Sequence, residues 1–551
     1  MSALGVLFKL SYFSLFIGTF IVFFSLLILF YSLGSMRGQK GLVRYYIYLL
    51  LTALTALGVV FANHLIVFLI FWGFMGLLLY LLIGFGQKER TPQTAKKAFI
   101  ILVGTDALMI LGLAIIWKLT GSWSMDKIHI ALTSSLAVVA YLCLVAAAFA
   151  KAGALPFHTW IPDTAQDAPA SVVAFFLAAL DKFLGIYFLV RVSLDLFQMN
   201  AVMGTFLMAM GSLTIVCAVM MALVQHDLKR LLGYHAVSQV GYTVLGIGTG
   251  NPIGIAGGLF HMLNNAVFKS CLFLSAGAVE KKAGTTDLDK LGGLSKTMPV
   301  IYMAFLIASL AISGVPPLNG FFSKWMIYQG VIETGKQGNQ LWILWLMAAM
   351  FGSALTLASF MKLVHAVFLG QSSAERTSLT LEKNKTPLTM WFPIVLLASL
   401  CVLFGVWARQ IPLGVFIYPS LKQHVLFSGT WSAGVATILI FLGIFIGFVI
   451  YLLSKAGKSR TTAAFIGGES LKDNPEMRMS GTDFYRTVQD MRGLKTIYEL
   501  AQRKVFDIYE LGVKGAQRLY SVLRYFHNGV LPTYLAWCLL GMLVFFYILL
   551  K

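Results

Sequence analysis

Four lysines lie within or at the edge of long apolar stretches of this 551-residue chain: Lys151, Lys182, Lys269 and Lys324. A lysine at the centre of a bilayer costs roughly 3 kcal/mol on insertion scales, so four of them are unfavourable unless they have a function. A buried lysine can also gain or lose its proton, because desolvation disfavours the charged form and a nearby carboxylate favours it. A row of such groups across a membrane is what proton transfer requires.

The composition identifies an all-α polytopic membrane protein, with 58% hydrophobic residues, 12% charged residues and a mean hydropathy of +0.82. The five cysteines lie in apolar stretches without metal-ligand spacing, so no disulfide framework, metal site or iron–sulfur site is expected. No Walker loop, dinucleotide fingerprint or haem motif occurs, which predicts no cofactor in this chain. The net charge of +20 has no separate basic domain behind it, so nucleic acid is not an expected partner.

Apolar runs of about 20 residues can cross a bilayer, and the sequence contains about fourteen of them. They lie near residues 8–34, 43–62, 65–86, 98–117, 134–152, 169–192, 202–225, 232–249, 253–279, 298–327, 340–370, 389–408, 430–454 and 530–550. Basic residues are concentrated in the loops after odd-numbered runs, and such loops are usually cytoplasmic. We therefore expect the inner membrane of a prokaryote, with both termini on the outer face.

Residues 467–528 are as polar as a soluble protein and interrupt this pattern. Within them, residues 493–525 have the apolar periodicity of one amphipathic helix on the cytoplasmic side. A helix of about 33 residues extends roughly 50 Å, far enough to brace a neighbouring subunit. The alternative is a helix that rests on its own bundle or on lipid. Residues 530–550 are expected to form a final anchoring span.

Two apolar runs contain prolines close to lysines. Pro156 follows Lys151 by five residues, and the pair Pro316–Pro317 precedes Lys324. Proline interrupts a helix, and broken helices at membrane depth are tolerated only around protein-lined or wet cavities. Paired broken helices favour inverted repeats. We expect these repeats at residues 43–192 and 202–327, after a peripheral span in residues 1–42 and before additional spans in residues 340–454.

Several ordered segments carry a family resemblance: FHTWIPDTAQDAPASVVAFF, LVQHDLKRLLGYHAVSQVGY, GLFHMLNNAVFKSCLFLSAGAV and ISGVPPLNGFFSK. They resemble the antiporter-like subunits of respiratory complex I, energy-converting hydrogenases and Mrp-type cation/proton antiporters. The resemblance implies two inverted five-helix repeats with two broken helices. FIGGE at residues 465–469, followed by a polar amphipathic region and one last span, resembles the largest of these subunits, whose lateral helix holds its neighbours together.

The resemblance also implies roles for the lysines. Lys151 matches the central protonatable residue of the first half, and Lys182 falls within one residue of the lysine that bridges the halves. Lys269 matches the central lysine of the second half, with His261 as its relay. Lys324 matches the terminal group near the outer exit.

Three further residues complete the expected path. Asp106 matches an acid on the sixth helix of the larger family members. From its position in the sequence, Asp181 lies beside Lys182, and His235 follows a cytoplasmic turn where protons could be taken up.

Lys182 departs from the family pattern by one residue, and a second position departs further. The family has a glutamate after the tryptophan of FWE, whereas this chain has Gly73 after Trp72. The carboxylate that normally pairs with Lys151 is therefore absent. Either Asp106 or Asp181 substitutes for it, or the first half is impaired or differently coupled.

Without an energy source of its own, such a chain must be driven by partner subunits or by another ion gradient. The first interpretation is a non-redox, proton-translocating subunit of a complex I-like or hydrogenase-type oxidoreductase, with quinone- or hydrogenase-module subunits as partners. The alternatives are a Na⁺/H⁺ antiporter subunit of the Mrp type and the membrane subunit of a proton-driven inorganic-carbon uptake system.

Overall fold

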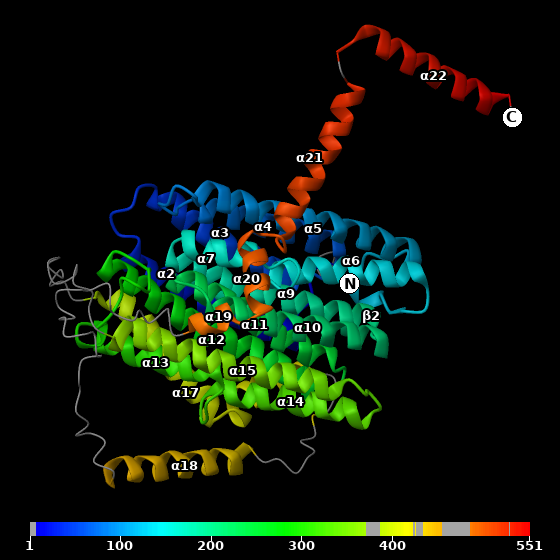
Figure 1. The fold of residues 1–551 in the computed structure, drawn as a ribbon. Coiled ribbons are helices and arrows are strands. Elements are labelled where there is room, and N and C mark those ends of the chain that lie inside the picture. Colours follow the sequence, from blue (N-terminus) through cyan, green and yellow to red (C-terminus); the bar gives the residue numbers. More distant parts are fainter. Residues whose placement is uncertain are drawn as a thin grey trace. The chain divides into compact units, whose positions relative to one another are not determined.

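The computed structural model describes residues 7–370, 386–421, 425, 433–453, 485–527 and 529–550. The chain divides into two units between Gln489 and Asp490. The larger unit contains a bundle of helices that run side by side (Figure 1). The FIGGE motif at residues 465–469 and the rest of residues 454–484 lie outside the described residues.

The first helices of the bundle include the first break, which lies between Ala152 and Trp160. They are α2 (Tyr12–Ser35), α3 (Leu42–Phe61), α4 (Leu65–Ile83), α5 (Thr91–Thr120), α6 (Ser135–Ala152), α7 (Trp160–Asp167), α8 (Ala170–Val173), the π-helix η2 (Ala174–Leu180), α9 (Asp181–Val190) and the π-helix η3 (Arg191–Leu196). The short strands β1 (Ile130–Ala131) and β2 (Phe197–Gln198) pair in parallel, with Ile130 opposite Phe197.

The later helices contain the second break. They are α10 (Ala201–Leu223), α11 (Leu228–Gly248), α12 (Pro252–Ala283), α13 (Pro299–Ser313), α14 (Asn319–Lys336), α15 (Trp342–Val364), the π-helix η5 (His365–Leu369), α17 (Leu388–Val406), the π-helix η6 (Arg409–Ile417) and α18 (Ala433–Leu453). Short 3₁₀ turns lie at η1 (Met125–Lys127), η4 (Leu294–Lys296) and η7 (Tyr418–Ser420).

The all-α polytopic fold class is confirmed. Among the described residues, 11 helices are long and apolar enough to cross a membrane, and two shorter apolar helices occur at residues 299–313 and 437–450. The break expected at Pro316–Pro317 within the apolar run at residues 298–327 is present, and the second segment continues beyond residue 327. Helix α13 ends at Ser313, and α14 begins at Asn319 and continues to Lys336. The chain leaves helical geometry at Gly314, which has a φ of 85° that favours glycine.

Two helical segments form the centre of the bundle. The apolar stretches within Ala170–Leu196 and Pro252–Ala283 are completely buried, whereas the other candidate spans keep part of their surface exposed. A helix that is apolar on all sides is stable only when protein or lipid surrounds it. These two segments carry Lys182 and Lys269, so both lysines lie deep inside the protein.

Glycines allow the helices of the second half to approach closely. A Cβ on Gly241 of α11 would lie 2.6 Å from the carbonyl oxygen of Gly211 on α10. A Cβ on Gly211 would lie 2.6 Å from the backbone nitrogen of Leu245. Because atoms at these distances overlap, each helix needs a glycine where it meets the other.

The structure of the smaller unit differs from the prediction for residues 493–525. The single helix expected over residues 493–525 is wrong, because α20 (Leu494–Gln502) and α21 (Ile508–Phe526) are separate helices. Lys504 between them has a φ of 57°, outside helical geometry. Asp507 caps α21 by accepting a hydrogen bond from the backbone nitrogen of Tyr509 (3.0 Å).

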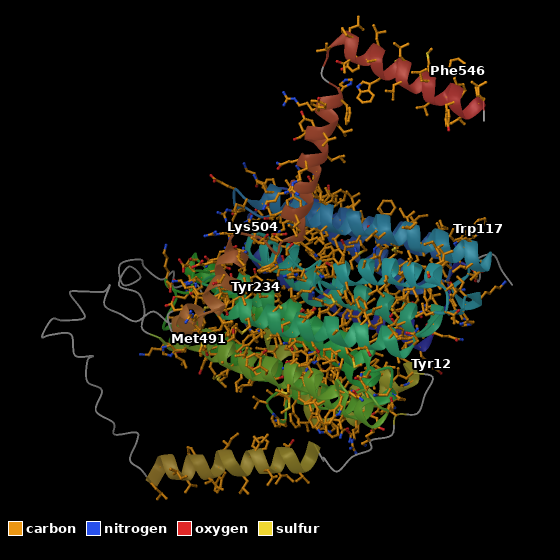
Figure 2. The ribbon with its side chains drawn as sticks, turned by 45° about the vertical axis from the view of Figure 1, so that its right-hand side comes forward. Tyr12, Trp117, Tyr234, Met491, Lys504 and Phe546 are labelled. Carbon is orange, nitrogen blue, oxygen red and sulfur yellow. The ribbon has the colours of Figure 1, made fainter. Side chains whose placement is uncertain are left out.

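The smaller unit ends in the apolar helix α22 (Leu531–Leu549), the expected final span. None of the side chains in its apolar stretch is buried. Figure 2 shows Phe546 on this helix and Lys504 at the break between α20 and α21.

We predict that Gly241→Ala destabilises the protein by about 1–3 kcal/mol, the usual range for overpacking. The thermal unfolding temperature of the detergent-solubilised protein measures the effect. Gly104→Ala in α5 is the matched control, because a Cβ there meets no atom within 4 Å. Alanine favours helix more than glycine does, so the control should be neutral or slightly stabilising. Equal unfolding temperatures for the two variants would contradict close packing at Gly241.

Candidate functional site

Lys151 lies in the last turn of α6, directly before the first break. Its side chain is 1% exposed, and its Nζ has no hydrogen-bond partner. The ammonium group instead lies over the ring of Trp72, 4.9 Å from the ring centre. An aromatic face attracts a cation, by about 2 kcal/mol or more when water is excluded. The site therefore stabilises Lys151 by a cation–π contact.

Trp72 connects this lysine to a carboxylate. Its indole Nε1 donates a hydrogen bond to Oδ1 of Asp106 on α5 (2.8 Å). Asp106 and Lys151 also interact through their charges. At Gly73, where the family has a glutamate, a Cβ would meet no atom within 4 Å. A Cβ is therefore tolerated at Gly73, and Asp106 provides an acid on the neighbouring helix.

Lys182 and Asp181 lie on the buried segment beside the first break. The Nζ of Lys182 donates to the carbonyl oxygen of Ala152, the last residue of α6. Both carboxylate oxygens of Asp181 are buried without a hydrogen-bond partner, and Asp181 interacts electrostatically with both Lys151 and Lys182. Lys182 also interacts electrostatically with Lys269. These two residues therefore link the first half to the second.

Lys269 lies on α12 and is completely buried. Its Nζ donates to the carbonyl oxygen of Leu232 on α11 (2.9 Å) and lies 5.6 Å from the ring centre of Phe360. The ring of His235 packs on Phe360 from a distance of 4.8 Å. Nε2 of His235 contacts the hydroxyl of Ser359 on α15 (2.8 Å), and its charge interacts with that of Lys269.

His261 continues the series. Its Nε2 lies 3.1 Å from Oε1 of Gln239, and its Nδ1 lies 2.9 Å from the hydroxyl of Ser323, the residue before Lys324. Its charge interacts with that of Lys324. A histidine with a partner at each ring nitrogen can accept a proton on one side and release one on the other.

Lys324 lies on α14, after the second break. Its Nζ donates to the carbonyl oxygen of Ile312 in the last turn of α13 (2.9 Å) and lies 4.6 Å from the ring centre of Tyr242. The hydroxyl of Tyr242 contacts that of Ser353 (2.9 Å), which in turn contacts that of Tyr328 (2.7 Å). Lys324 thus resembles Lys182, because the Nζ of each donates a hydrogen bond to a carbonyl oxygen at the end of an interrupted helix.

Lys362 is a buried lysine that the sequence analysis did not single out. Lys362 on α15 is 5% exposed and donates to the carbonyl oxygens of Leu223 (2.8 Å) and Gln225 (3.1 Å), where α10 ends. Its charge interacts with that of His235. Lys362 lies in the apolar run at residues 340–370, so the criterion that found the other four lysines would also have found it.

No feature of the sequence comparable to a lysine in an apolar run pointed to the side chains that lie between the charged groups. Trp72, Gln239, Tyr242, Ser323 and Ser359 make the contacts that join the lysines and histidines. In the sequence they are ordinary members of apolar helices. Among the described residues, no group of three or more histidine, cysteine or acidic side chains is arranged to hold a metal ion.

With this arrangement established, comparison with known proteins identifies the family. Residues 62–356, more than half of the chain, match the family described as NADH:quinone oxidoreductase/Mrp antiporter, TM. The chain belongs to this family. It is therefore an antiporter-like, multi-pass membrane protein, as the sequence motifs predicted.

The proteins similar to this chain include Na⁺/H⁺ antiporter subunits and a subunit of an NAD(P)H-quinone oxidoreductase. One Na⁺/H⁺ antiporter subunit of Alkalihalophilus pseudofirmus is 33% identical over 348 residues, which cover 62% of this chain and 68% of the relative. A second Na⁺/H⁺ antiporter subunit of the same organism is 28% identical over 446 residues, covering 77% of this chain and 53% of that subunit. NAD(P)H-quinone oxidoreductase chain 5 of Picosynechococcus sp. is 29% identical over 586 residues, covering 95% and 84%. The chain spans about half the length of the second antiporter subunit.

Two solved structures share the fold. A chain of the membrane-bound sulfane sulfur reductase, an archaeal respiratory membrane complex, is 24% identical with a TM-score of 0.79, covering 98% of this chain and 89% of that one. A chain of the Mrp complex from Dietzia sp. DQ12-45-1b is 22% identical with a TM-score of 0.68, covering 75% and 83%.

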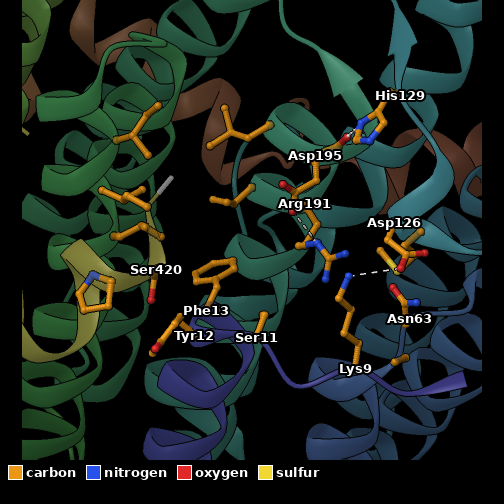
Figure 3. Close-up of a pocket in the computed structure, with 18 of the residues that line it drawn as sticks. Lys9, Ser11, Tyr12, Phe13, Asn63, Asp126, His129, Arg191, Asp195 and Ser420 are labelled. Atoms are coloured by element: carbon orange, nitrogen blue, oxygen red, sulfur yellow. Dashed lines mark hydrogen bonds and ion pairs between the residues drawn. The ribbon is translucent and has the colours of Figure 1, made fainter. Parts of the chain in front are cut away.

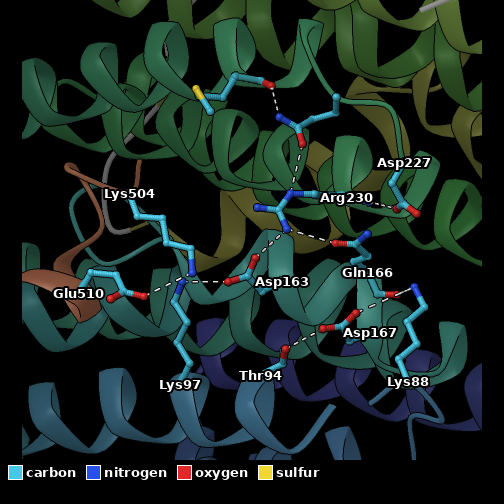
Figure 4. A network of polar contacts seen from close by, with 12 residues as sticks. Lys88, Thr94, Lys97, Asp163, Gln166, Asp167, Asp227, Arg230, Lys504 and Glu510 are labelled. Carbon is cyan, nitrogen blue, oxygen red and sulfur yellow. Dashed lines mark hydrogen bonds and ion pairs between the residues drawn. The ribbon is translucent and has the colours of Figure 1, made fainter. Parts of the chain in front are cut away.

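A second group of polar side chains ties helix ends together in this family member (Figure 4). Asp163 on α7 forms ion pairs with Lys97 of α5 (2.8 Å) and Arg230 of α11 (2.8 Å). Asp167, at the end of α7, accepts a hydrogen bond from Thr94 (2.7 Å). The second segment of the broken helix is therefore fixed to two neighbouring helices by charge.

A pocket of about 510 Å³ lies near the start of α2 and the end of η3 (Figure 3). Lys9 pairs with Asp126 (3.2 Å), and Arg191 pairs with Asp195 (2.8 Å). Hydrogen bonds from Ser124 and then from Lys9 lower the pKa of Asp126 to about 2. The stabilisation from Asp126 is present above about pH 4, the usual aspartate pKa, and is lost as the pH falls through about 2.

We predict that Asp163→Asn lowers the free energy of unfolding by about 1–3 kcal/mol, because it removes the negative charge that Lys97 and Arg230 share. Chemical or thermal unfolding of the purified protein measures this loss. The control is Asp287→Asn, which removes an exposed pair with Lys290 (4.0 Å), and exposed pairs contribute about 0–1 kcal/mol. If the control lost as much stability as Asp163→Asn, the network would have no special role in the fold.

Proposed function

We propose that this chain is a proton-translocating subunit of a redox-driven membrane complex of the complex I or hydrogenase type. The observation that carries the proposal is the series of buried and half-buried titratable groups through both halves. Each group is linked to another member by a shared side chain or by charge, and His235 and His261 both interact by charge with Lys324. The series is Asp106, Lys151, Asp181, Lys182, Lys269, His235, His261 and Lys324.

In this proposal, protons from the cytoplasm reach His235 beside Lys362 and charge Lys269. Ser359 and Lys362 lie three residues apart on α15 and so share a face, which places the hydroxyl that contacts His235 close to the ammonium group. Protons then pass by His261 and Ser323 to Lys324 and leave on the outer side. Moving one charge against 100 mV requires about 2.3 kcal/mol, so the energy must come from partner subunits.

Lys151, Asp181 and Lys182 would couple this second half to events in the first. A change in the charge of Lys151 alters the field at Asp181, and a change at Lys182 alters the field at Lys269. We propose that Asp106, through Trp72, takes the place of the glutamate that is absent at Gly73. The hydrogen bond and the cation–π contact that join the three side chains support this assignment over Asp181.

The break falls in the fourth of five spans in each half when the second half is taken from α10 through η5. We therefore propose repeats at about 42–196 and 201–369, which extends the second repeat beyond residue 327. We also propose that the basic loops lie in the cytoplasm, that both termini face outward, and that the membrane is a prokaryotic inner membrane. The described part of the polar region, residues 485–527, would then lie on the cytoplasmic side and contact partner subunits.

An Mrp-type Na⁺/H⁺ antiporter component is the second candidate, because the relatives named above include two Na⁺/H⁺ antiporter subunits. Coverage favours the redox complex. The similarity to NAD(P)H-quinone oxidoreductase chain 5 extends over 95% of this chain and 84% of the relative, whereas the second antiporter subunit is covered over only 53% of its length.

Mild-detergent purification of the tagged chain, with mass spectrometry of the proteins that accompany it, tests the function. We expect iron–sulfur proteins together with quinone- or hydrogenase-type subunits. Small antiporter subunits alone would replace the proposal with Na⁺/H⁺ antiport. A large zinc protein as sole partner would replace it with inorganic-carbon uptake.

We predict that Asp106→Asn decreases proton translocation about tenfold or more, because a positioned acid or base contributes at least about a hundredfold to proton transfer. Fluorescence quenching of a pH-sensitive dye in membrane vesicles that contain the whole complex measures the rate. Adding Gly73→Glu to Asp106→Asn should restore part of the activity, because it returns the glutamate of the family pattern at a position where a Cβ meets no atom within 4 Å.

Asp126→Asn in an exposed loop is the control and should translocate protons at the wild-type rate. Wild-type translocation by Asp106→Asn would remove Asp106 from the path. Loss of the complex from the membrane in that variant would show a structural role instead, so the amount of assembled complex is measured alongside the rate.

A further inference from the structure

A second pocket, of about 340 Å³, lies where several helices end. Ser35 from the last turn of α2, Lys88 after α4, Lys229 at the start of α11 and Lys281 near the end of α12 all line it. Because all these helix ends meet at one place, the pocket opens at one boundary of the apolar bundle and away from its middle. It is separate from the series of lysines described above.

Four basic and two acidic side chains line this pocket. Both acids already have partners. Glu280 accepts from Lys229 (2.9 Å), and Asp167 accepts from Thr94 (2.7 Å) and lies 3.9 Å from Lys88. The pocket therefore keeps an excess of positive charge after these pairs are formed.

Three groups in the pocket are available to bind an anion. Among the described residues, the guanidinium of Arg37 forms no ion pair or hydrogen bond, and the hydroxyl of Ser35 is buried without a partner. The Nζ of Lys281 donates to the carbonyl oxygen of Gly34 (2.6 Å), which leaves two of its three hydrogens. Arginine and lysine bind phosphate oxygens by charge-assisted hydrogen bonds.

We propose that this pocket binds the phosphate group of an anionic phospholipid. Basic pockets between membrane helices are typical sites for such headgroups. The neighbouring helix α3 exposes Val43 and Ile47 in its first two turns, with relative exposures of 73% and 48%, which gives the acyl chains an apolar surface. A Cβ on Gly41, just before α3, would lie 3.4 Å from the ring of Phe85 in the pocket wall, so that surface adjoins the pocket.

The test is native mass spectrometry of the purified protein, titrated with phosphatidylglycerol or with zwitterionic phosphatidylcholine. We expect phosphatidylglycerol to bind at least about tenfold more tightly, and Arg37→Gln to remove most of that preference, since one charge-assisted contact accounts for about this factor. Lys40→Gln is the matched control, because Lys40 lies in the same loop without lining the pocket. Arg37→Lys, which keeps the charge, should retain part of the preference.

Competition with inorganic phosphate identifies the source of the phosphate group. Displacement of the lipid only by molar phosphate supports a headgroup site, whereas displacement at millimolar phosphate replaces it with a site for a free anion. Equal binding of the two lipids, or equal losses from Arg37→Gln and Lys40→Gln, would overturn the proposal. Unchanged thermal unfolding temperatures for the variants show that any loss arises at the pocket itself.

Discussion

A buried ammonium group must find hydrogen-bond acceptors, and the last carbonyl oxygens of a helix are available because they lack a donor from the helix's own backbone. The helix ends of this protein supply them. Lys182 donates to the end of α6, Lys324 to the last turn of α13, and Lys362 to the end of α10. The negative end of a helix also attracts a cation. Helix ends therefore help three of the buried lysines to lie in the bundle, whereas Lys269 donates to Leu232 within α11 and Lys151 lies over the ring of Trp72.

In the first half, Lys151 differs from these lysines because its Nζ donates to no carbonyl oxygen at a helix end. Lys151 has an aromatic ring where the family pattern leads one to expect a carboxylate, and its Nζ lacks any acceptor. A cation–π contact contributes about 2 kcal/mol, whereas an ion pair at 4 Å contributes about 4 kcal/mol at an effective dielectric of 20.

In the second half, the hydrogen bonds between polar side chains depend on close packing of the helices that carry them. Glycines at the α10–α11 contact bring the two backbones together, and α11 carries both His235 and Gln239. Gln239 reaches His261 on α12, and Ser323 on α14 reaches the other ring nitrogen of the same histidine. A shift of one helix by a single residue would separate these partners, because side chains on a helix turn by about 100° per residue. Packing errors should therefore impair function before they unfold the protein.

The sequence by itself determined the class of protein, the family and the four lysines, because apolar runs, proline breaks and ordered motifs are local properties of the chain. It also located the missing carboxylate at Gly73. Only the tertiary structure decided which groups meet: that Asp106 bonds to Trp72 beneath Lys151, that Ser323 and Gln239 join His261, and that Lys362 faces the His235 site. It also divided residues 493–525 into two helices at Lys504, where apolar periodicity alone had indicated one. The physical reason is that these contacts join residues far apart in the sequence, 34 positions for Trp72 and Asp106 and 62 for His261 and Ser323, and their distances depend on how the helices pack.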